Sequence, residues 1–166
     1  MAKIITVRHA ALLVVMTMLL AACGFHLQGR QGLPPSLARV HIEADEGQSD
    51  FVSSLRNALT AAGARVEPRP GEGIARVRVL RDEVTERVLT VSSRNIPTDY
   101  ELTHELRIVV DGPDGKELMP AEEFSLTRVY SFDERKLLAK EREKDLLLGA
   151  LAGDMTSVVL RRLGSL

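Results

Sequence analysis

The 166-residue sequence contains no tryptophan, and aromatic residues of all kinds make up only 4% of it. Bases and sugars are commonly bound by stacking on aromatic side chains, so a stacking platform of that kind is not expected. Only one cysteine, Cys23, is present, and no disulfide can therefore form within the chain. The fold must be stabilised by ordinary packing of apolar side chains.

The sequence also lacks the usual signatures of catalytic and metal sites. Three histidines follow the leader region, at His26, His41 and His104, and none forms a His-x-x-x-His pair. Ser53, His41 and Asp50 could be combined into a Ser-His-Asp set, but any chain of this size permits such a selection. His41 and His104 are predicted on polar strand faces. No enzyme and no metal site is expected. A small hydrolase is an alternative that would require an activated nucleophile beside a base.

A short apolar stretch lies near the N-terminus. Ala10–Leu20 is uncharged and 11 residues long, whereas a helix that spans a bilayer needs about 20 residues. Lys3 and Arg8 precede it, and Leu20-Ala21-Ala22-Cys23 follows, a pattern typical of a secretory leader that ends in a bacterial lipobox. We predict that residues 1–22 are a signal peptide and that Cys23 becomes the lipidated N-terminus. The alternative is a free cysteine behind an ordinary signal peptide.

Lipidation of Cys23 would attach a diacylglycerol and an N-acyl chain, and no other cofactor is expected. Two or more chains anchor a protein stably, whereas a single chain holds it only marginally. Gly24 follows the cysteine, where an aspartate is the common inner-membrane retention signal of enterobacterial lipoproteins. Gly24 therefore favours a lipid-anchored location at the outer membrane.

Loss of Lys3 and Arg8 with the leader shifts the formal net charge from −1 to −3. General nucleic-acid binders are usually strongly basic, so nucleic acid is not an expected partner. An anionic ligand would have to be met by a local cluster of Lys and Arg. The mature chain is long enough for one domain, which we place at residues 37–166, after a glycine- and proline-rich tether at 23–36.

Hydrophobic periodicity predicts the elements of that domain. Helical spacing is found over residues 50–62, where Ser49 or Asp50 can cap the first turn, and again from about 133, where Ser131 and Glu134 have capping-box spacing. Residues 65–73 are predicted to be a turn-rich connection. Alternation predicts strands over residues 37–44, 74–93, 100–110 and 124–132.

The valine-rich stretch 74–93 is either one strand with a bulge near residues 82–87 or two strands joined by a tight turn. Together the elements predict an α+β fold, a two-layer α/β sandwich. Its mixed sheet would have about four strands and would be covered on one face by two helices.

The C-terminal helix is predicted to have two parts. Residues 140–145 alternate in charge and are expected to form a solvated face with pairs three and four positions apart. An apolar seam follows at Leu148, Leu151, Met155, Val158 and Leu163. Gly149 and Gly153 lie within that seam, either as a notch for another surface or as a local kink or a point of close packing on the sheet.

Two cations are candidates for ligand binding. Arg94 lies in the loop after residue 93, and Lys140 lies in the first turns of the last helix. If the sheet is an antiparallel meander, both could lie at the same end and bind phosphates through charge-assisted hydrogen bonds. The alternative is that they are ordinary exposed basic residues.

The segment Cys23-Gly24-Phe25-His26-Leu27 resembles the mature start of LptE, the family of lipopolysaccharide-assembly lipoproteins of the outer membrane. Further matching segments follow in order along the chain, at residues 98–102, 128–133, 138–141 and 160–163. The resemblance implies a non-enzymatic partner of the LptD β-barrel, which sits within the barrel as a plug, helps the barrel to fold, and binds lipopolysaccharide. It also implies that Arg94 and Lys140 contact lipopolysaccharide. The alternative function is an accessory lipoprotein of another envelope lipid-transport system.

Overall fold

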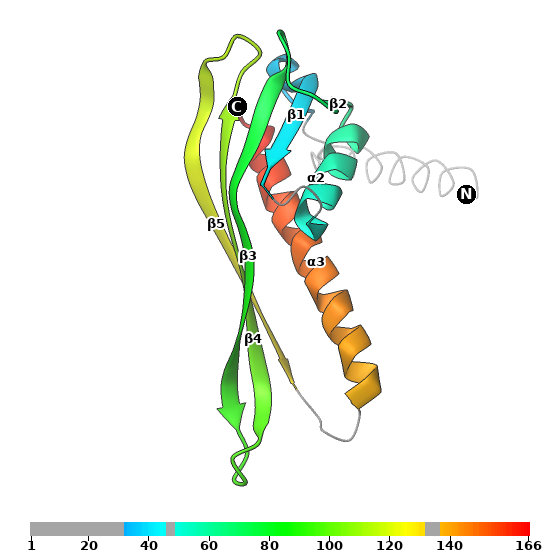
Figure 1. Ribbon diagram of the computed structural model, residues 1–166, viewed down its shortest axis with the longest axis vertical. Helices are drawn as coiled ribbons and strands as arrows, with labels where there is room; N and C mark the ends of the chain where they lie inside the picture. The colour runs from blue at the N-terminus through cyan, green and yellow to red at the C-terminus, as the bar shows by residue number, and fades with distance from the viewer. Residues whose placement is uncertain (1–31, 46–48, 132–136) are drawn as a thin grey trace, which may run out of the picture. The chain divides into compact units, whose positions relative to one another are not determined.

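The computed structural model describes residues 32–45, 49–131 and 137–166, the last range without the side chains of residues 137–141. Two helices lie on one side of a single sheet (Figure 1). The elements are η1 (Pro35–Leu37), β1 (Arg39–Ala44), α2 (Asp50–Ala61), β2 (Arg65–Glu67), β3 (Ala75–Val91), β4 (Pro97–Asp111), β5 (Glu117–Ser131) and α3 (Leu137–Leu163).

The sheet is mixed and has five strands in the order β2-β1-β3-β4-β5. β1 pairs in parallel with β2 and β3, and the pairs β3–β4 and β4–β5 are antiparallel. The predicted α+β sandwich is confirmed, with one strand more than expected. The additional strand, β2, lies in the predicted connection 65–73, where a run of three residues is too short to show alternation.

Helix α2 begins and ends as its sequence predicts. The Ser49 hydroxyl accepts a hydrogen bond from the Val52 N–H at 3.1 Å, and Gly63 takes a positive φ of 95° just after the helix. Val52, Leu55 and Leu59 are buried along one stripe. Each such side chain contributes about 1.5–3 kcal/mol when it is fully buried. The stripe joins α3 and the sheet in one core.

Strand β3 is continuous over 17 residues, so the two-strand alternative for this stretch is wrong. Its pairing with β4 shifts between Val79 and Arg81, and again on either side of Thr90. The irregularities therefore lie outside the predicted bulge region 82–87, whose residues pair in regular register. The extra residue at Leu80 explains why the valines before and after it alternate out of phase.

Helix α3 is described from Leu137 onward, so its start, predicted near residue 133, is not tested. Ser131 is the last residue of β5, where its hydroxyl donates to an Asp99 carboxylate oxygen at 2.7 Å, and its predicted capping partner Glu134 lies outside the described residues. Residues 132–136 lie outside the described part. Leu151, Met155 and Leu163 are buried as expected. Val158, which was predicted in the apolar seam, is only half-buried, and its neighbour Val159 is buried instead.

The glycines of α3 face open space. A Cβ atom built on Gly149 or Gly153 meets no atom within 4 Å outside the local helix backbone, so neither glycine marks close packing on the described part of the sheet. Replacing both with alanine is expected to raise the free energy of unfolding by about 1 kcal/mol per site, because glycine in a helix interior costs that much. Urea denaturation of both variants would measure the change, and a loss of stability would show that these positions need glycine.

A candidate functional surface at the end of the β3–β4 hairpin

The sheet narrows beyond the end of β1. β1 pairs with β3 only as far as Ala44 and Val79, and past that point β3, β4 and β5 continue as a three-stranded extension. Figure 1 shows that the first half of α3 lies at the same end of the molecule as this extension and its β3–β4 turn. The topology therefore confirms that the loop after residue 93 and the start of the last helix share one end.

Arg94 lies at the tip of the β3–β4 hairpin. The Ser92 N–H donates to the Ile96 carbonyl at 2.7 Å, and the Asn95 N–H donates to the Ser92 carbonyl at 2.9 Å. Asn95 takes a φ of 59°, which asparagine tolerates better than most residues. The turn leaves Arg94 exposed, and it forms no ion pair with any residue that the structure describes. Arg94 is thus free to meet an anion.

Lys140 lies in the first turn of α3, but its side chain lies outside the described residues. Cys23 lies wholly outside the described residues. The structure thus places the backbone of Lys140 at the hairpin end without fixing where its ammonium group points.

Glu86 joins α3 to the three-stranded extension. The Lys144 ammonium and the Tyr130 hydroxyl both donate to its carboxylate. Tyr130 stacks on Tyr100, with ring centroids 5.5 Å apart. Burial alone would raise the pKa of Glu86, but the hydrogen bonds from Lys144 and Tyr130 more than offset this and leave the pKa below its ordinary value. Burial and the bond to Glu86 raise the pKa of Tyr130.

Sequence reasoning missed this contact, because it assigned residues 140–145 to a solvated helix face. Lys144 and Glu86 are 58 positions apart, and no local pattern connects them. A second pair, Arg128 with Asp154, links β5 to α3 closer to the core.

A buried polar group lies where β1 ends. His104 is 1% exposed, so its predicted place on a polar face is wrong. Its Nε2 lies 2.7 Å from Asp82 Oδ1, while the Ser49 hydroxyl donates to Asp82 Oδ2 at 2.5 Å. Burial alone would raise the pKa of Asp82, but the bonds from His104 and Ser49 more than offset it and lower that pKa. Alternation along β4 continues through His104, and that pattern could have indicated its burial.

The serine, histidine and aspartate proposed from sequence are not connected in this way. Nδ1 of His41 lies 3.0 Å from the main-chain oxygen of Glu67. Among the described residues, no hydrogen bond joins His41 to Ser53 or Asp50. In the set that does meet, Asp82 lies between Ser49 and His104, so the histidine does not contact the serine hydroxyl as a general base would.

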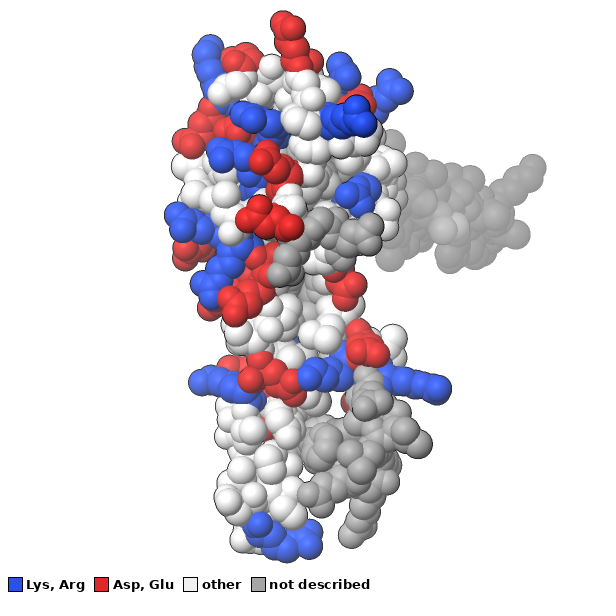
Figure 2. Space-filling view, viewed as in Figure 1, with Lys and Arg blue, Asp and Glu red and all other residues white. Residues whose placement is uncertain are grey.

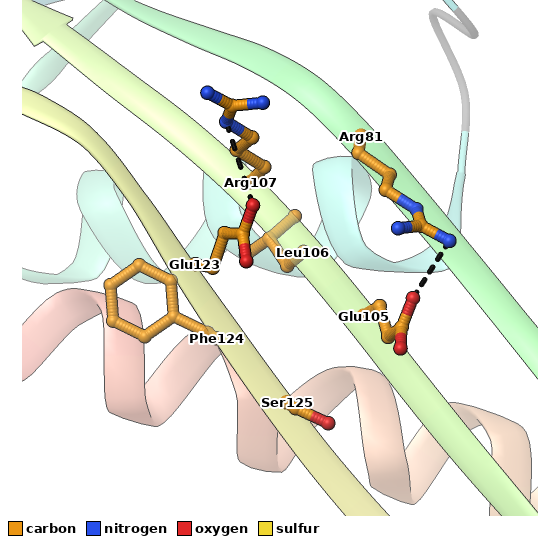
Figure 3. Close-up of a pocket in the computed structure, with 7 residues that line it drawn as sticks. All are labelled: Arg81, Glu105, Leu106, Arg107, Glu123, Phe124 and Ser125. Carbon is orange, nitrogen blue, oxygen red and sulfur yellow. Dashed lines mark ion pairs between the residues drawn. The ribbon is translucent and has the colours of Figure 1, made fainter.

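The face of the extension that is turned away from the helices carries paired charges. Arg81 Nη2 lies 2.7 Å from Glu105, and Arg107 Nε lies 3.8 Å from Glu123. Both pairs line a shallow pocket, drawn in Figure 3, together with Leu106, Phe124 and Ser125. Exposed pairs of this kind contribute about 0–1 kcal/mol each, so they shape a neutral polar surface more than they stabilise the fold.

Figure 2 shows that the charged side chains gather over the upper part of the molecule and in a band across its middle. Below the band the visible surface is uncharged down to the tip. Residues 88–100, which we call the hairpin end, contain only two charged residues, Arg94 and Asp99. This end of the molecule therefore carries little charge apart from a cation at its tip.

The family model LptE, described as "Lipopolysaccharide-assembly", matches residues 37–163. The chain belongs to the LptE family. This confirms the resemblance noted from the sequence, and it gives the chain a role in lipopolysaccharide assembly.

Two LptE relatives span most of the chain. The LPS-assembly lipoprotein LptE of Yersinia enterocolitica is 20% identical over 94% of this chain and 76% of its own length. The LPS-assembly lipoprotein LptE of Pectobacterium atrosepticum is 23% identical over 86% of this chain and 77% of its own length.

Solved structures confirm the LptE-like fold. The solution structure of an uncharacterised lipoprotein B from Nitrosomonas europaea is similar with a TM-score of 0.70 and 25% identity, over 86% of this chain and 91% of that one. The crystal structure of rare lipoprotein B from Shewanella oneidensis has a TM-score of 0.66 and 20% identity, over 76% and 94% of the two chains. In the described part of this LptE chain, no helix is both long and apolar enough to cross a membrane.

Proposed function

We propose that this chain is an outer-membrane lipoprotein that binds lipopolysaccharide and assists its insertion into the outer leaflet as a plug and assembly partner of the LptD β-barrel. The role is one of contact rather than catalysis. Cys23, carrying a diacylglycerol and an N-acyl chain, would tether the domain to the membrane. Membership of a lipopolysaccharide-assembly family supports the proposal, as do the lipoprotein relatives.

The observation that carries ligand binding is the exposed Arg94 guanidinium at the tip of the hairpin, at the end where α3 begins. Lipopolysaccharide carries phosphates, and a guanidinium donates charge-assisted hydrogen bonds to phosphate in a well-matched geometry. We assign Arg94 and Lys140 to these phosphates. A few placed cations suit a chain whose mature net charge is −3.

The Arg94→Ala/Lys140→Ala variant is expected to bind lipopolysaccharide about 10-fold more weakly, because two charge-assisted contacts are lost. The measurement is a binding titration at moderate salt with the full chain. Arg65→Ala/Lys116→Ala is the matched control. Both of its residues are highly exposed cations, and Lys116 follows the β4–β5 turn at the opposite end of β4. Unchanged affinity in the first variant, or an equal loss in the control, would remove Arg94 and Lys140 from the site.

Association with the barrel has its own test. The full chain, purified from detergent-solubilised outer membranes, is expected to bring with it a large β-barrel protein in equal amount. Isolation without such a barrel would favour an accessory lipoprotein of another lipid-transport system.

Mass spectrometry of the N-terminal peptide would test lipidation of Cys23, and an unmodified thiol would contradict the proposed anchor.

A further inference from the structure

We propose that the hairpin end, residues 88–100, binds the hydrocarbon of a lipopolysaccharide molecule. This proposal rests on the proposed function, which assigns the phosphates of the same ligand to Arg94, and adds a second, apolar subsite to it. Arg94 would then contact the phosphates of the ligand, and the exposed aliphatic side chains would contact its acyl chains.

The hairpin end exposes aliphatic side chains that the core does not use. Val88, Leu89 and Val91 are 48%, 44% and 52% exposed. Leu89 has no partner in the ladder with β4, because the register shifts between Val88 and Thr90. A residue outside the regular ladder is free to project from the strand. Such side chains gain free energy when an apolar ligand removes them from water.

Neither charged residue of the hairpin end interrupts the exposed aliphatic side chains. Asp99 accepts hydrogen bonds from the hydroxyls of Thr90 and Ser131 and lies within the strand pairing rather than at the tip. Arg94 is the other charged residue in the segment, and it lies at the turn. An apolar surface that ends in a cation complements a molecule in which acyl chains meet phosphates.

A bilayer interior fits this surface less well than a bound acyl chain does. Within the described residues, no strand pairs with the outer edge of β3 beyond Val79. That edge would carry unsatisfied N–H and C=O groups into the hydrocarbon, where no water can bind them. An acyl chain that lies against the side chains leaves those backbone groups in contact with water.

A protein strand added to the same edge is also disfavoured. Arg81, Glu83 and Arg87 carry charges along β3 close to the open edge, and the shifts at Leu80 and near Thr90 interrupt its register. Charges and bulges are the features by which edge strands resist pairing with another chain. An acyl chain needs no register, so it is the occupant that we assign.

The test uses the full chain in detergent, with lipid A and with the deacylated, phosphorylated disaccharide of lipid A as the two probes. The variant is Leu89→Ser/Val91→Ser. The matched control is Leu80→Ser/Val84→Ser, which changes two exposed apolar residues of the same strand above the hairpin end; Leu80 is 47% exposed. Thermal melts establish that both variants fold, which is expected because all four side chains lie outside the core.

The wild-type chain is expected to bind lipid A at least 10-fold more tightly than the disaccharide. The hairpin-end variant should lose at least 5-fold in affinity for lipid A and keep its affinity for the disaccharide, while the control keeps both affinities. Equal binding of lipid A by the variant and the wild type would overturn the proposal, as would an equal loss in the control.

Two further outcomes separate the possible sources of binding. If the disaccharide does not bind at all and the variant still loses affinity for lipid A, the phosphate assignment fails and the hydrocarbon subsite stands. If phosphatidylglycerol vesicles without lipopolysaccharide bind the wild-type chain as tightly as lipid A does, and the variant abolishes this binding, the hairpin end is a bilayer contact and the acyl-chain proposal is wrong.

Discussion

Replacing Asp82 with alanine is expected to lower the free energy of unfolding by about 2–3 kcal/mol, although Asp82 lies in no hydrophobic cluster. Its carboxylate is bonded to both the buried His104 ring and the Ser49 hydroxyl. Nδ1 of His104 already has no hydrogen-bond partner among the described residues. Loss of Asp82 would leave both nitrogens of the buried ring unpaired, and a buried polar group without a partner loses its solvation without compensation.

The same substitution would weaken the start of α2. Ser49 caps that helix while it donates to Asp82, so the aspartate holds the cap in place. Urea denaturation would measure the loss. Ser49→Ala is a useful comparison, since it removes the cap but leaves the bond between Asp82 and His104, and it should cost about 1 kcal/mol. A loss for Asp82→Ala no larger than for Ser49→Ala would show that His104 does not depend on its partner.

The Asp82 network also predicts a dependence on pH. In the fold the pKa of Asp82 is lowered below its ordinary value of 3.8, so ionised Asp82 stabilises the protein above that value. The advantage of the wild type over Asp82→Asn should therefore be complete above pH of about 5 and should shrink as the pH falls through the pKa in the fold. Denaturation curves of both proteins across this range would test it, and a constant difference would contradict the network.

Replacing Met155 with alanine is expected to lower the free energy of unfolding by about 2–4 kcal/mol, because it removes a large side chain from the core and leaves a cavity. Met155 is fully buried on α3 among the apolar residues that α2 and the sheet contribute. Leu146, nine positions earlier on the same helix, is 75% exposed. Leu146→Ala should change stability by no more than about 0.5 kcal/mol.

The contrast divides α3 into a half that belongs to the core and a half that does not. Chemical denaturation of the two variants would measure it directly. A loss for Leu146→Ala similar to that for Met155→Ala would show that the first half of the helix packs as tightly as the second. Leu146 would then be buried in the folded protein, in contrast to its exposure in this structure.

Local signals predicted the parts of the fold that local chemistry determines. The cap at Ser49 and the helical spacing over residues 50–62 together located α2 to within one residue at its C-terminal end. Asn95 and Gly115, at the two hairpin turns, take the positive φ angles that such turns require. Arg94 could be placed at the hairpin tip for the same reason.

Contacts between distant segments were beyond the reach of sequence patterns. The existence of β2, the register shift at Leu80 and the bond between Glu86 and Lys144 all depend on what lies beside them in space. His104 is the instructive case. This histidine was predicted on a polar strand face, although a carboxylate on the neighbouring strand allows its ring to be buried.

The parallel pairing of β1 with β2 and β3 bears on how the chain reaches its native state. The β3–β4 and β4–β5 hairpins join neighbours in the sequence and can form quickly. β1 must wait for a strand that emerges well after it, and α3 completes the core from the last residues of the chain. Because such long-range contacts form slowly, the apolar side of the sheet stays uncovered until the last helix has packed on it.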